Sequence, residues 1–274
     1  MKKVRWIIQN NLIAENDRNQ FQEACDKLNI AHHEVIVVPF SDELPDFPLD
    51  DEYENIYYGS TTFMNNLYNK LKPIGLFYNH ETFSMENYFE KWGEHMLSSD
   101  AEIITVKDFI ELEDFGHQLN MFLRPDGDGK EFDGQVGEVE ELKSMVKRMM
   151  DYESPMTMES KLVLGPAYNL QREWRNYVVD GKVITSSRYR NNFRLSKSGD
   201  DIPEDMIKFV EDRCKEYQPH EVFAMDIAET RHDDGDMRYY IIECGCMNSV
   251  GFYHADIEKY VKSLTQWVES KVIV

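Results

Sequence analysis

Short apolar runs alternate with amphipathic stretches over the first hundred residues. The runs have the length of strands and occupy residues 4–8, 32–40, 55–60, 74–78 and 101–106. Between them, helical patterns occupy residues 15–28, 61–71 and 85–97. Strands that alternate with helices predict a mostly parallel sheet with helices on its faces. We therefore expect an α/β domain over residues 1–100.

The pattern changes after residue 100. Strands are predicted at residues 120–125 and 161–168, and residues 171–190 predict a hairpin that turns at Asp180-Gly181. Helices are predicted at residues 136–151, 203–217 and 255–270, and Asp201 and Glu204 flank Pro203 as an expected capping box. The polar segment 189–200 contains glycine and serine, so it predicts either a mobile lid or an ordinary surface loop.

Two strands near the end of the chain each carry one carboxylate among apolar residues. Asp226 lies in FAMDIA and Glu243 in YYIIECG. A buried carboxylate is costly unless it is paired or bound to a metal ion. One such residue alone would favour pairing with an arginine. Two on neighbouring strands, with Asn248 just beyond, favour an Mg²⁺ site, because carboxylate and amide oxygens are hard ligands.

The preceding segments supply candidate cations. In REWRNYVV, alternation places Glu173 and Arg175 on one face of a strand. Arginine binds phosphate or carboxylate through two parallel hydrogen bonds, and this favours a functional role for Arg175 and Arg188 slightly over a solvated one. The loop RPDGDGKEFDGQ has glycines that could approach phosphate closely, with Lys130 among them. Taken alone, this loop is better interpreted as an ordinary turn with a surface lysine.

Composition narrows the class of protein. The 274 residues include 51 Asp+Glu and 30 Lys+Arg, which gives a net charge of −21. This charge argues against nucleic acid and anionic membranes as partners. The four cysteines do not form a zinc motif, so free thiols are predicted. The N-terminal segment is basic, but its apolar run is too short for a signal peptide. A cytoplasmic protein is expected.

The C-terminal part resembles the ATP-grasp superfamily, and most of all the small RimK-like ligases of phages and bacteria. The resemblance rests on four stretches in order: FLRPDGDGKEFDGQ, EWRNYVVDGKVITSSRYR, FAMDIA and YYIIECGCMNSVGFY. It implies an α/β (α+β) fold in which a pre-ATP-grasp domain (residues 1–100) precedes a two-lobed ATP-grasp fold (lobes 101–160 and 161–274). It also implies an ATP-dependent carboxylate–amine ligase that forms an acyl phosphate from a small-molecule or peptide acid.

The same resemblance implies a role for individual residues. Arg175 and Arg188 would stabilise the transferring phosphoryl group or the substrate carboxylate. Asp226, Glu243 and Asn248 would bind Mg²⁺. The ATP-binding residues would be Arg124, Lys130, Lys161, Leu162, Val163, Leu164 and Glu173.

The sequence departs from the family pattern in two places. The usual terminal Glu-x-Asn motif is Glu243-Cys244-Gly245 here, with the first asparagine at position 248, and Arg124 stands where many relatives have lysine. The altered motif keeps a second interpretation open, a nucleotide-binding module without ligase activity. The charge of −21 leaves a third, an acidic interaction or inhibitor protein.

Overall fold

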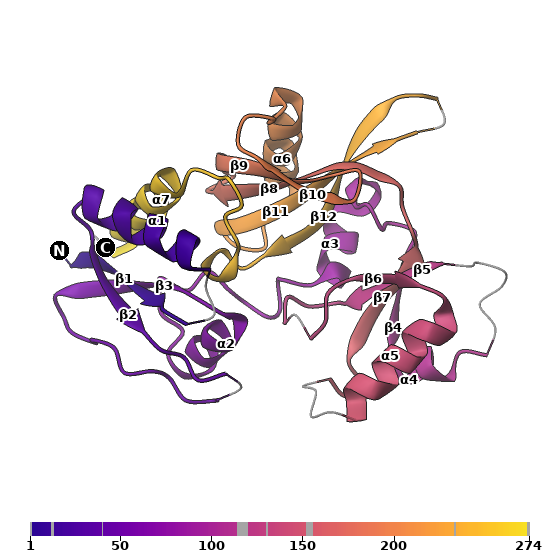
Figure 1. Cartoon of the computed structure of the whole chain (residues 1–274), viewed down its shortest axis with the longest axis horizontal. Coiled ribbons are helices and arrows are strands. Elements are labelled where there is room, and N and C mark those ends of the chain that lie inside the picture. Colours follow the sequence, from indigo (N-terminus) through magenta and orange to yellow (C-terminus); the bar gives the residue numbers. More distant parts are fainter. Residues whose placement is uncertain are drawn as a thin grey trace.

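A computed structural model of the chain describes residues 2–11, 14–39, 41–113, 120–129, 131–151, 156–232 and 234–272. It contains three sheets, each built from a different part of the chain and flanked by helices (Figure 1). In Figure 1 the N-terminal sheet lies at the left, the largest sheet at the centre and the third at the lower right.

The N-terminal sheet has three parallel strands, with β1 in the middle. Its elements are β1 (Lys3–Gln9), α1 (Glu15–Lys27), β2 (Ala31–Val35), β3 (Tyr53–Tyr58) and α2 (Thr61–Lys70). The predicted α/β alternation is confirmed for this part. The run at residues 74–78 makes only one bridge, between Gly75 and Ile56. It does not continue as a strand, because the Asn248 side chain takes the next backbone groups, Gly75 O and Phe77 N.

The second sheet is antiparallel, with the strand order β4-β7-β5-β6. Its elements are β4 (Glu102–Thr105), α4 (Val106–Glu111), β5 (Met121–Pro125), β6 (Gln135–Gly137), α5 (Val139–Asp151) and β7 (Lys161–Pro166). The expectation that residues 101–106 extend the parallel sheet is wrong, since β4 pairs antiparallel with β7. An apolar run predicts a strand without predicting its partner. Here Gly165 admits the close neighbour, because a Cβ at this position would lie 2.7 Å from Ala101 Cβ.

The largest sheet has five antiparallel strands in the order β10-β9-β8-β11-β12. Its elements are β8 (Leu170–Val179), β9 (Lys182–Asn191), β10 (Arg194–Ser198), α6 (Glu204–Glu216), β11 (Val222–Arg231), β12 (Met237–Gly245) and α7 (Ile257–Val272). The predicted hairpin turn is confirmed, with positive φ at Asp180 and Gly181. The segment predicted as a lid or loop is a second hairpin, in which β9 and β10 are joined at Asn192-Phe193.

The expected capping box before α6 is wrong. Pro203 is the N-cap residue, and no side chain caps the helix. The Asp201 carboxylate is engaged elsewhere, because it accepts hydrogen bonds from Arg172 and Arg188.

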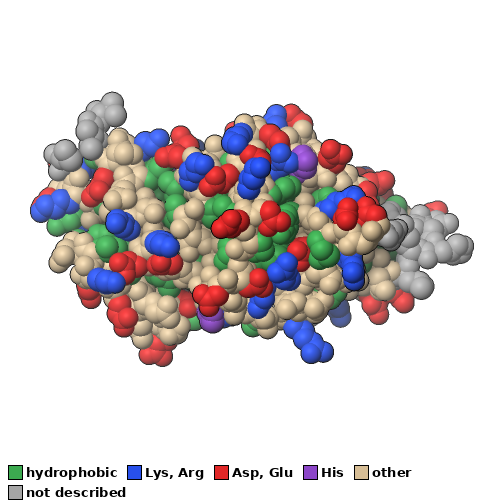
Figure 2. Space-filling view, turned by 90° about the horizontal axis from the view of Figure 1, so that it is seen from above, with side chains coloured by type: hydrophobic (Ala, Val, Ile, Leu, Met, Phe, Trp, Pro, Cys, Tyr) green, Lys and Arg blue, Asp and Glu red, His purple; other side chains and the backbone are tan. Residues whose placement is uncertain are grey.

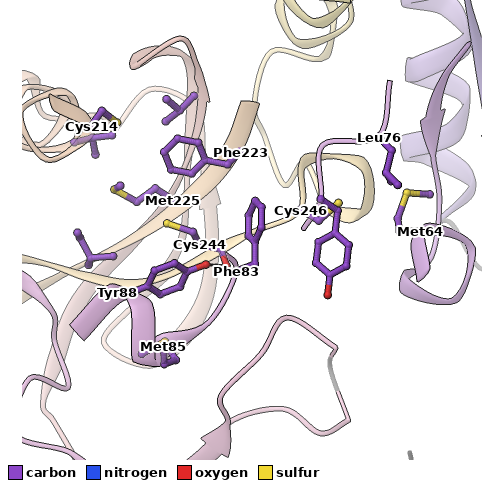
Figure 3. Close-up of a cluster of buried hydrophobic side chains, with 14 of the residues drawn as sticks. Met64, Leu76, Phe83, Met85, Tyr88, Cys214, Phe223, Met225, Cys244 and Cys246 are labelled. Carbon is purple, nitrogen blue, oxygen red and sulfur yellow. Dashed lines mark hydrogen bonds between the residues drawn. The ribbon is translucent and has the colours of Figure 1, made fainter. Parts of the chain in front are cut away.

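The two faces of the five-stranded sheet have different surroundings. On one face, called the outer face here, Trp174 and Met225 pack in a core with α6 and with α3 (Met85–Trp92). Figure 3 shows part of this core, where Met225, Cys244 and Tyr88 lie together. The opposite face, called the inner face, carries Arg175 and Asp226 and is linked by an ion pair to the four-stranded sheet.

The N-terminal sheet and the five-stranded sheet share buried aromatic residues. Trp6 from β1, Tyr177 from β8 and Tyr260 from α7 belong to one core, and Trp6 Nε1 donates to Thr265 Oγ1 at 3.0 Å. The four-stranded sheet packs its own core against α4 and α5. The N-terminal and five-stranded sheets are therefore joined by continuous packing. The four-stranded sheet also contacts the five-stranded one, through Val163 in the core that includes Trp174 and through the Arg124–Glu243 ion pair.

All four cysteines are buried thiols that form no disulfide, as the sequence predicts. Among the residues that the structure describes, no helix is long and apolar enough to cross a membrane. Acidic and basic side chains are intermingled on the face shown in Figure 2.

Candidate functional site

Two carboxylates face each other on the inner face. Asp226 on β11 lies opposite Glu243 on β12 in the strand register, so both side chains leave the sheet on the same side. On its other flank Asp226 lies opposite Arg175 of β8. Arg175 binds it through both nitrogens of its fork, with Nε–Oδ1 and Nη2–Oδ2 distances of 2.8 Å. This pair is almost fully buried.

The second carboxylate pairs with an arginine from another sheet. Arg124 at the end of β5 forms an ion pair with Glu243, and its side chain is only 13% exposed. Burial alone would lower the pKa of Arg124, but the neighbouring Glu243 charge raises it overall. The two carboxylates are thus each matched by an arginine, and the Arg124–Glu243 pair connects the four-stranded sheet to the five-stranded one.

The glycine-rich loop after β5 also reaches β12. Asp128 Oδ2 accepts a hydrogen bond from the backbone N–H of Cys246 at 2.8 Å, and Gly127 bridges to Ser84. The loop therefore closes on the end of the strand that carries Glu243. Lys130, predicted to bind ATP, lies outside the described residues.

Glu173 of β8 is buried beside this pair of carboxylates, on the same face. It is 3% exposed, and its Oε2 accepts from the Tyr189 hydroxyl at 3.0 Å and lies 3.7 Å from Arg190 Nη1. Its Oε1 has no hydrogen-bond partner among the residues that the structure describes. Burial raises the pKa of Glu173, and Arg190 and the Tyr189 hydroxyl partly offset this effect.

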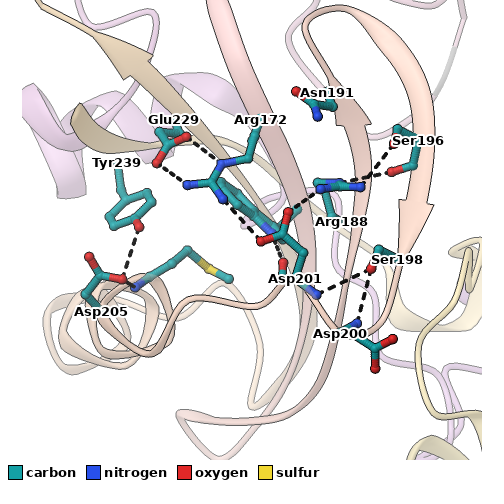
Figure 4. Close-up of polar contacts among 12 residues, drawn as sticks. Arg172, Arg188, Asn191, Ser196, Ser198, Asp200, Asp201, Asp205, Glu229 and Tyr239 are labelled. Atoms are coloured by element: carbon teal, nitrogen blue, oxygen red, sulfur yellow. Dashed lines mark hydrogen bonds and ion pairs between the residues drawn. The ribbon is translucent and has the colours of Figure 1, made fainter.

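Arg188 does not join Arg175. A register shift in the β8–β9 pair places Arg188 opposite Trp174 on the outer face, whereas Arg190 lies opposite Glu173 on the inner face. Figure 4 shows Arg188 bound to Asp201 and to Ser196 of β10. The geometry therefore gives no support to a shared phosphoryl site for Arg175 and Arg188. Regular alternation would put Arg188 and Arg190 on one face, and the register shift puts only Arg190 on the inner face.

Asn248 points away from the two carboxylates, toward the N-terminal sheet. It is fully buried, its Oδ1 accepts from Phe77 N at 2.7 Å, and its Nδ2 donates to Tyr57 O at 2.7 Å and Gly75 O at 2.8 Å. With a longer contact from Cys246 Sγ to Oδ1 at 3.6 Å, these hydrogen bonds use the donors and acceptors of the amide. The side chain thus connects two parts of the fold instead of reaching Asp226 or Glu243.

Comparison with known proteins decides the family. The sequence profile of the ATP-grasp domain, R2K clade family 3, matches residues 73–264, which is most of the chain. The chain belongs to this ATP-grasp family. The resemblance seen in the sequence is therefore confirmed, as is the expected α/β fold with a two-lobed ATP-grasp part.

Solved structures share the fold at low sequence identity. The D-cycloserine synthetase DcsG superposes with a TM-score of 0.63 at 12% identity, covering 97% of this chain and 99% of that one. The ATP-grasp ligase PsnB, complexed with a phosphomimetic variant of its minimal precursor, Mg and ADP, gives 0.56 at 10% identity, with coverages of 98% and 99%. A RimK-domain ATP-grasp protein from Sphaerobacter thermophilus DSM 20745 gives 0.55 at 9%, with 98% and 100%. No curated protein sequence matches the chain significantly.

In this ATP-grasp fold, β7 carries the four consecutive residues predicted at the nucleotide. Leu162 and Leu164 are buried in the core of the four-stranded sheet, and Val163 is buried on the opposite side in the core that includes Trp174. Lys161 is partly exposed and its ammonium lies 2.5 Å from Glu86 Oε2. Only the Val163 side thus faces away from the lobe's own core.

Among the described residues, some buried polar atoms without a hydrogen-bond partner lie on segments of the ATP-grasp part, and two others, Arg213 Nε and Gln218 Oε1, lie on or just after α6. Besides Glu173 Oε1, the former include Glu131 Oε2 in the glycine-rich loop and the Tyr168 hydroxyl between β7 and β8. Buried polar groups normally have a hydrogen-bond partner, so orphaned ones near a site point to a ligand. Neither Glu131 nor Tyr168 is among the ATP-binding residues that the resemblance implies.

The donor set fits a magnesium ion that also binds phosphate. No group of three or more His, Cys, Asp or Glu side chains converges anywhere in the described parts of the chain, so no complete protein cage is present there. Mg²⁺ does not need one, because it commonly binds one or two carboxylates together with substrate phosphates. Asp226 and Glu243 supply two such carboxylates on one face.

Proposed function

We propose that the protein is an ATP-dependent ligase that joins a carboxylate to an amine through an acyl phosphate. The observation that carries the proposal is the opposed pair Asp226 and Glu243, each bound by a buried arginine, on the inner face of an ATP-grasp sheet. DcsG is a synthetase and PsnB a ligase, and these relatives of the fold support the same reaction class.

The reaction makes and breaks two sets of bonds. A carboxylate oxygen of the acid attacks the γ-phosphorus of ATP, and the bond from phosphorus to the ADP oxygen breaks. The amine nitrogen then attacks the acyl carbon, the carbon–oxygen bond to phosphate breaks, and the nitrogen loses a proton. Phosphoryl transfer depends mainly on positioning and on charge stabilisation. Arg124 and Arg175 are placed to supply that charge, since both are preorganised by their carboxylate partners.

Asp226 and Glu243 would hold Mg²⁺, and the orphaned oxygen of Glu173 would accept a hydrogen bond from the acid substrate. When bound, Mg²⁺ neutralises phosphate charge and acts as a Lewis acid. Val163 is left out, because it is fully buried in the core that includes Trp174. Arg188 and Asn248 are left out of this arrangement, because their side chains bind Asp201 and the N-terminal backbone, respectively.

One observation favours a second candidate, nucleotide binding without ligation. The asparagine of the terminal motif is committed to the backbone of Tyr57, Gly75 and Phe77, so the site has two anionic ligands and no amide ligand. Both candidates require Mg²⁺-dependent ATP binding. They differ in whether ADP is released when an acid and an amine are added.

The test incubates the protein with ATP and Mg²⁺, together with a pool of carboxylic acids as the acid and a pool of amino acids as the amine, and measures the ADP released. The ligase proposal predicts ADP release that requires both pools and is lost in Glu243→Gln. The loss of a charge from a buried pair can unfold a protein, so the melting temperature of the variant is measured alongside. ATP binding by wild type without ADP release from any pool would overturn the ligase and leave the binding module.

A further inference from the structure

Two stacked tyrosines form a platform on the inner face, beside the paired carboxylates. Tyr189 from β9 and Tyr253 from the loop before α7 have ring centroids 5.0 Å apart and planes inclined by 16°. Tyr253 has a φ of +55°, a backbone conformation that costs a non-glycine residue roughly 1–2 kcal/mol. Its neighbours hold it there, since Gly251 O accepts from the Tyr177 hydroxyl and His254 N donates to Ser187 Oγ.

Three cations surround this platform. The Arg175 guanidinium lies 5.3 Å from the Tyr253 ring centroid, the Arg190 guanidinium 5.9 Å from that of Tyr189, and Lys197 Nζ 5.7 Å from that of Tyr253. Cations are attracted to aromatic faces at such distances, so the rings hold the charges in place without neutralising them.

The charges of these cations are balanced to different degrees. Arg175 is neutralised by its two-pronged contact with Asp226. Among the described residues, Arg190 pairs with one carboxylate oxygen, Glu173 Oε2 at 3.7 Å, and that oxygen also accepts from Tyr189. Lys197 makes no ion pair with any carboxylate in the described part of the chain. The hairpin thus presents positive charge that the protein itself leaves largely unmatched.

The local sequence strengthens this imbalance. Residues 187–199 contain four Lys or Arg and no Asp or Glu, in a chain with a net charge of −21. A basic hairpin within an acidic protein attracts small anions to one place. The outer face fixes the hairpin in position, because Arg188 and Arg172 both bind Asp201 and Arg172 also binds Glu229 (Figure 4).

A buried acceptor next to the cations points to a ligand independently. Glu173 is only 3% exposed, yet its Oε1 has no hydrogen-bond partner among the described residues. A ligand donor, such as an amino or hydroxyl group, would satisfy it. A ligand that offers both a donor and a carboxylate therefore complements this corner of the site.

We propose that Arg190 and Lys197 form an anion subsite that binds a second, non-reacting carboxylate of the acid substrate, so the preferred acid is a dicarboxylate such as an acidic amino acid. The proposal rests on the proposed function for the identity of the reacting group. Arg190 lies on β9 opposite Glu173, and it is therefore a diagonal neighbour of Arg175, roughly 7–8 Å away across the sheet. A four- or five-carbon dicarboxylate would span that diagonal, with its reacting end beside Arg175 and its other end over the tyrosines.

Phosphate oxygens share this chemistry with carboxylates, and the location distinguishes them. Arg190 and Lys197 are on β9 and β10, whereas the carboxylates suited to a phosphate-bound metal ion are on β11 and β12, at the other side of the sheet. A phosphate group held at Asp226 and Glu243 is therefore served by Arg124 and Arg175.

The test compares glutarate with its monoamide, and L-glutamate with L-glutamine, by calorimetry on protein saturated with Mg²⁺ and a non-hydrolysable ATP analogue. Wild type should bind each diacid at least tenfold more tightly than its amide. Arg190→Gln and Lys197→Gln should each reduce this preference at least fivefold. Arg194→Gln is the matched control, because it removes a cation from the same hairpin that contacts neither tyrosine, and it should change the preference less than twofold.

The affinity for the ATP analogue separates the two sources of negative charge. It should be unchanged in all three variants. The proposal is overturned if wild type shows no preference for the diacids or does not bind them at millimolar concentration. It is also overturned if the preference survives both substitutions, or if the affinity for the analogue falls as much as that for the diacid. If wild type does not bind the analogue at all, the proposed function fails, and the same diacid titrations on nucleotide-free protein still decide the subsite.

Discussion

Replacing Asn248 with alanine should destabilise the fold and leave nucleotide binding intact. The substitution removes the partners of three buried backbone groups: Phe77 N, Tyr57 O and Gly75 O. A buried polar group left unsatisfied costs roughly 1–3 kcal/mol. The free energy of unfolding should therefore fall by at least about 3 kcal/mol, which lowers the melting temperature by about 6–12 °C in a chain of this size.

The assay pairs thermal unfolding with ATP titration in the presence of Mg²⁺, below the melting temperature of the variant. Ser249→Ala is the matched control, because its hydroxyl makes one long hydrogen bond to Cys246 O, at 3.4 Å. It should cost less than about 1 kcal/mol. The reasoning is refuted if Asn248→Ala has the same melting temperature as the control and also loses Mg²⁺-dependent ATP binding. That result would make Asn248 a metal ligand, as the sequence pattern predicts.

Two further predictions concern Glu173 and Asp201. Burial raises the pKa of Glu173, so the stability this carboxyl contributes is present below its ordinary value of 4.5 and is lost as the pH rises through the folded-state pKa. Glu173→Gln should therefore gain melting temperature relative to wild type between about pH 4.5 and pH 7, and parallel pH profiles of the two proteins would contradict this. Asp201→Asn weakens the contacts to Arg172 and Arg188, and should lower the free energy of unfolding by roughly 1 kcal/mol and speed proteolysis within the β9–β10 hairpin. Asp200→Asn, which loses no ion pair, is its control, and equal cleavage rates would count against the role of Asp201.

The strands and helices that the sequence predicts correctly are those with a strong local signal. The run at residues 4–8 and the helix at 15–28 bury their apolar positions as the periodicity implies, and Asp180-Gly181 adopts the turn that its residue types favour. Partners between strands are not local. The run at residues 101–106 therefore pairs with β7 in the four-stranded sheet. The backbone of residues 74–78 bonds to the Asn248 side chain in place of a neighbouring strand.

The site residues divide in the same way. Period-2 alternation places Glu173 and Arg175 on one face of β8, and the structure agrees. It does not place Asp226 relative to them, because that depends on the register between β8 and β11. It cannot anticipate the register shift in β9, which separates Arg188 from Arg190, and it cannot show that Asn248 finds backbone partners far along the chain. Both outcomes depend on tertiary contacts that one-dimensional spacing does not contain.

The most direct measurement is a calorimetric titration of ATP into wild type, with and without Mg²⁺, and into Glu243→Gln. This variant removes one charge from the Asp226–Glu243 pair and keeps an oxygen that can accept from Arg124. The account predicts ATP binding by wild type that depends on Mg²⁺, and binding at least tenfold weaker in the folded variant. ATP binding that is indifferent to both Mg²⁺ and the substitution, or no binding to folded wild type, would contradict it.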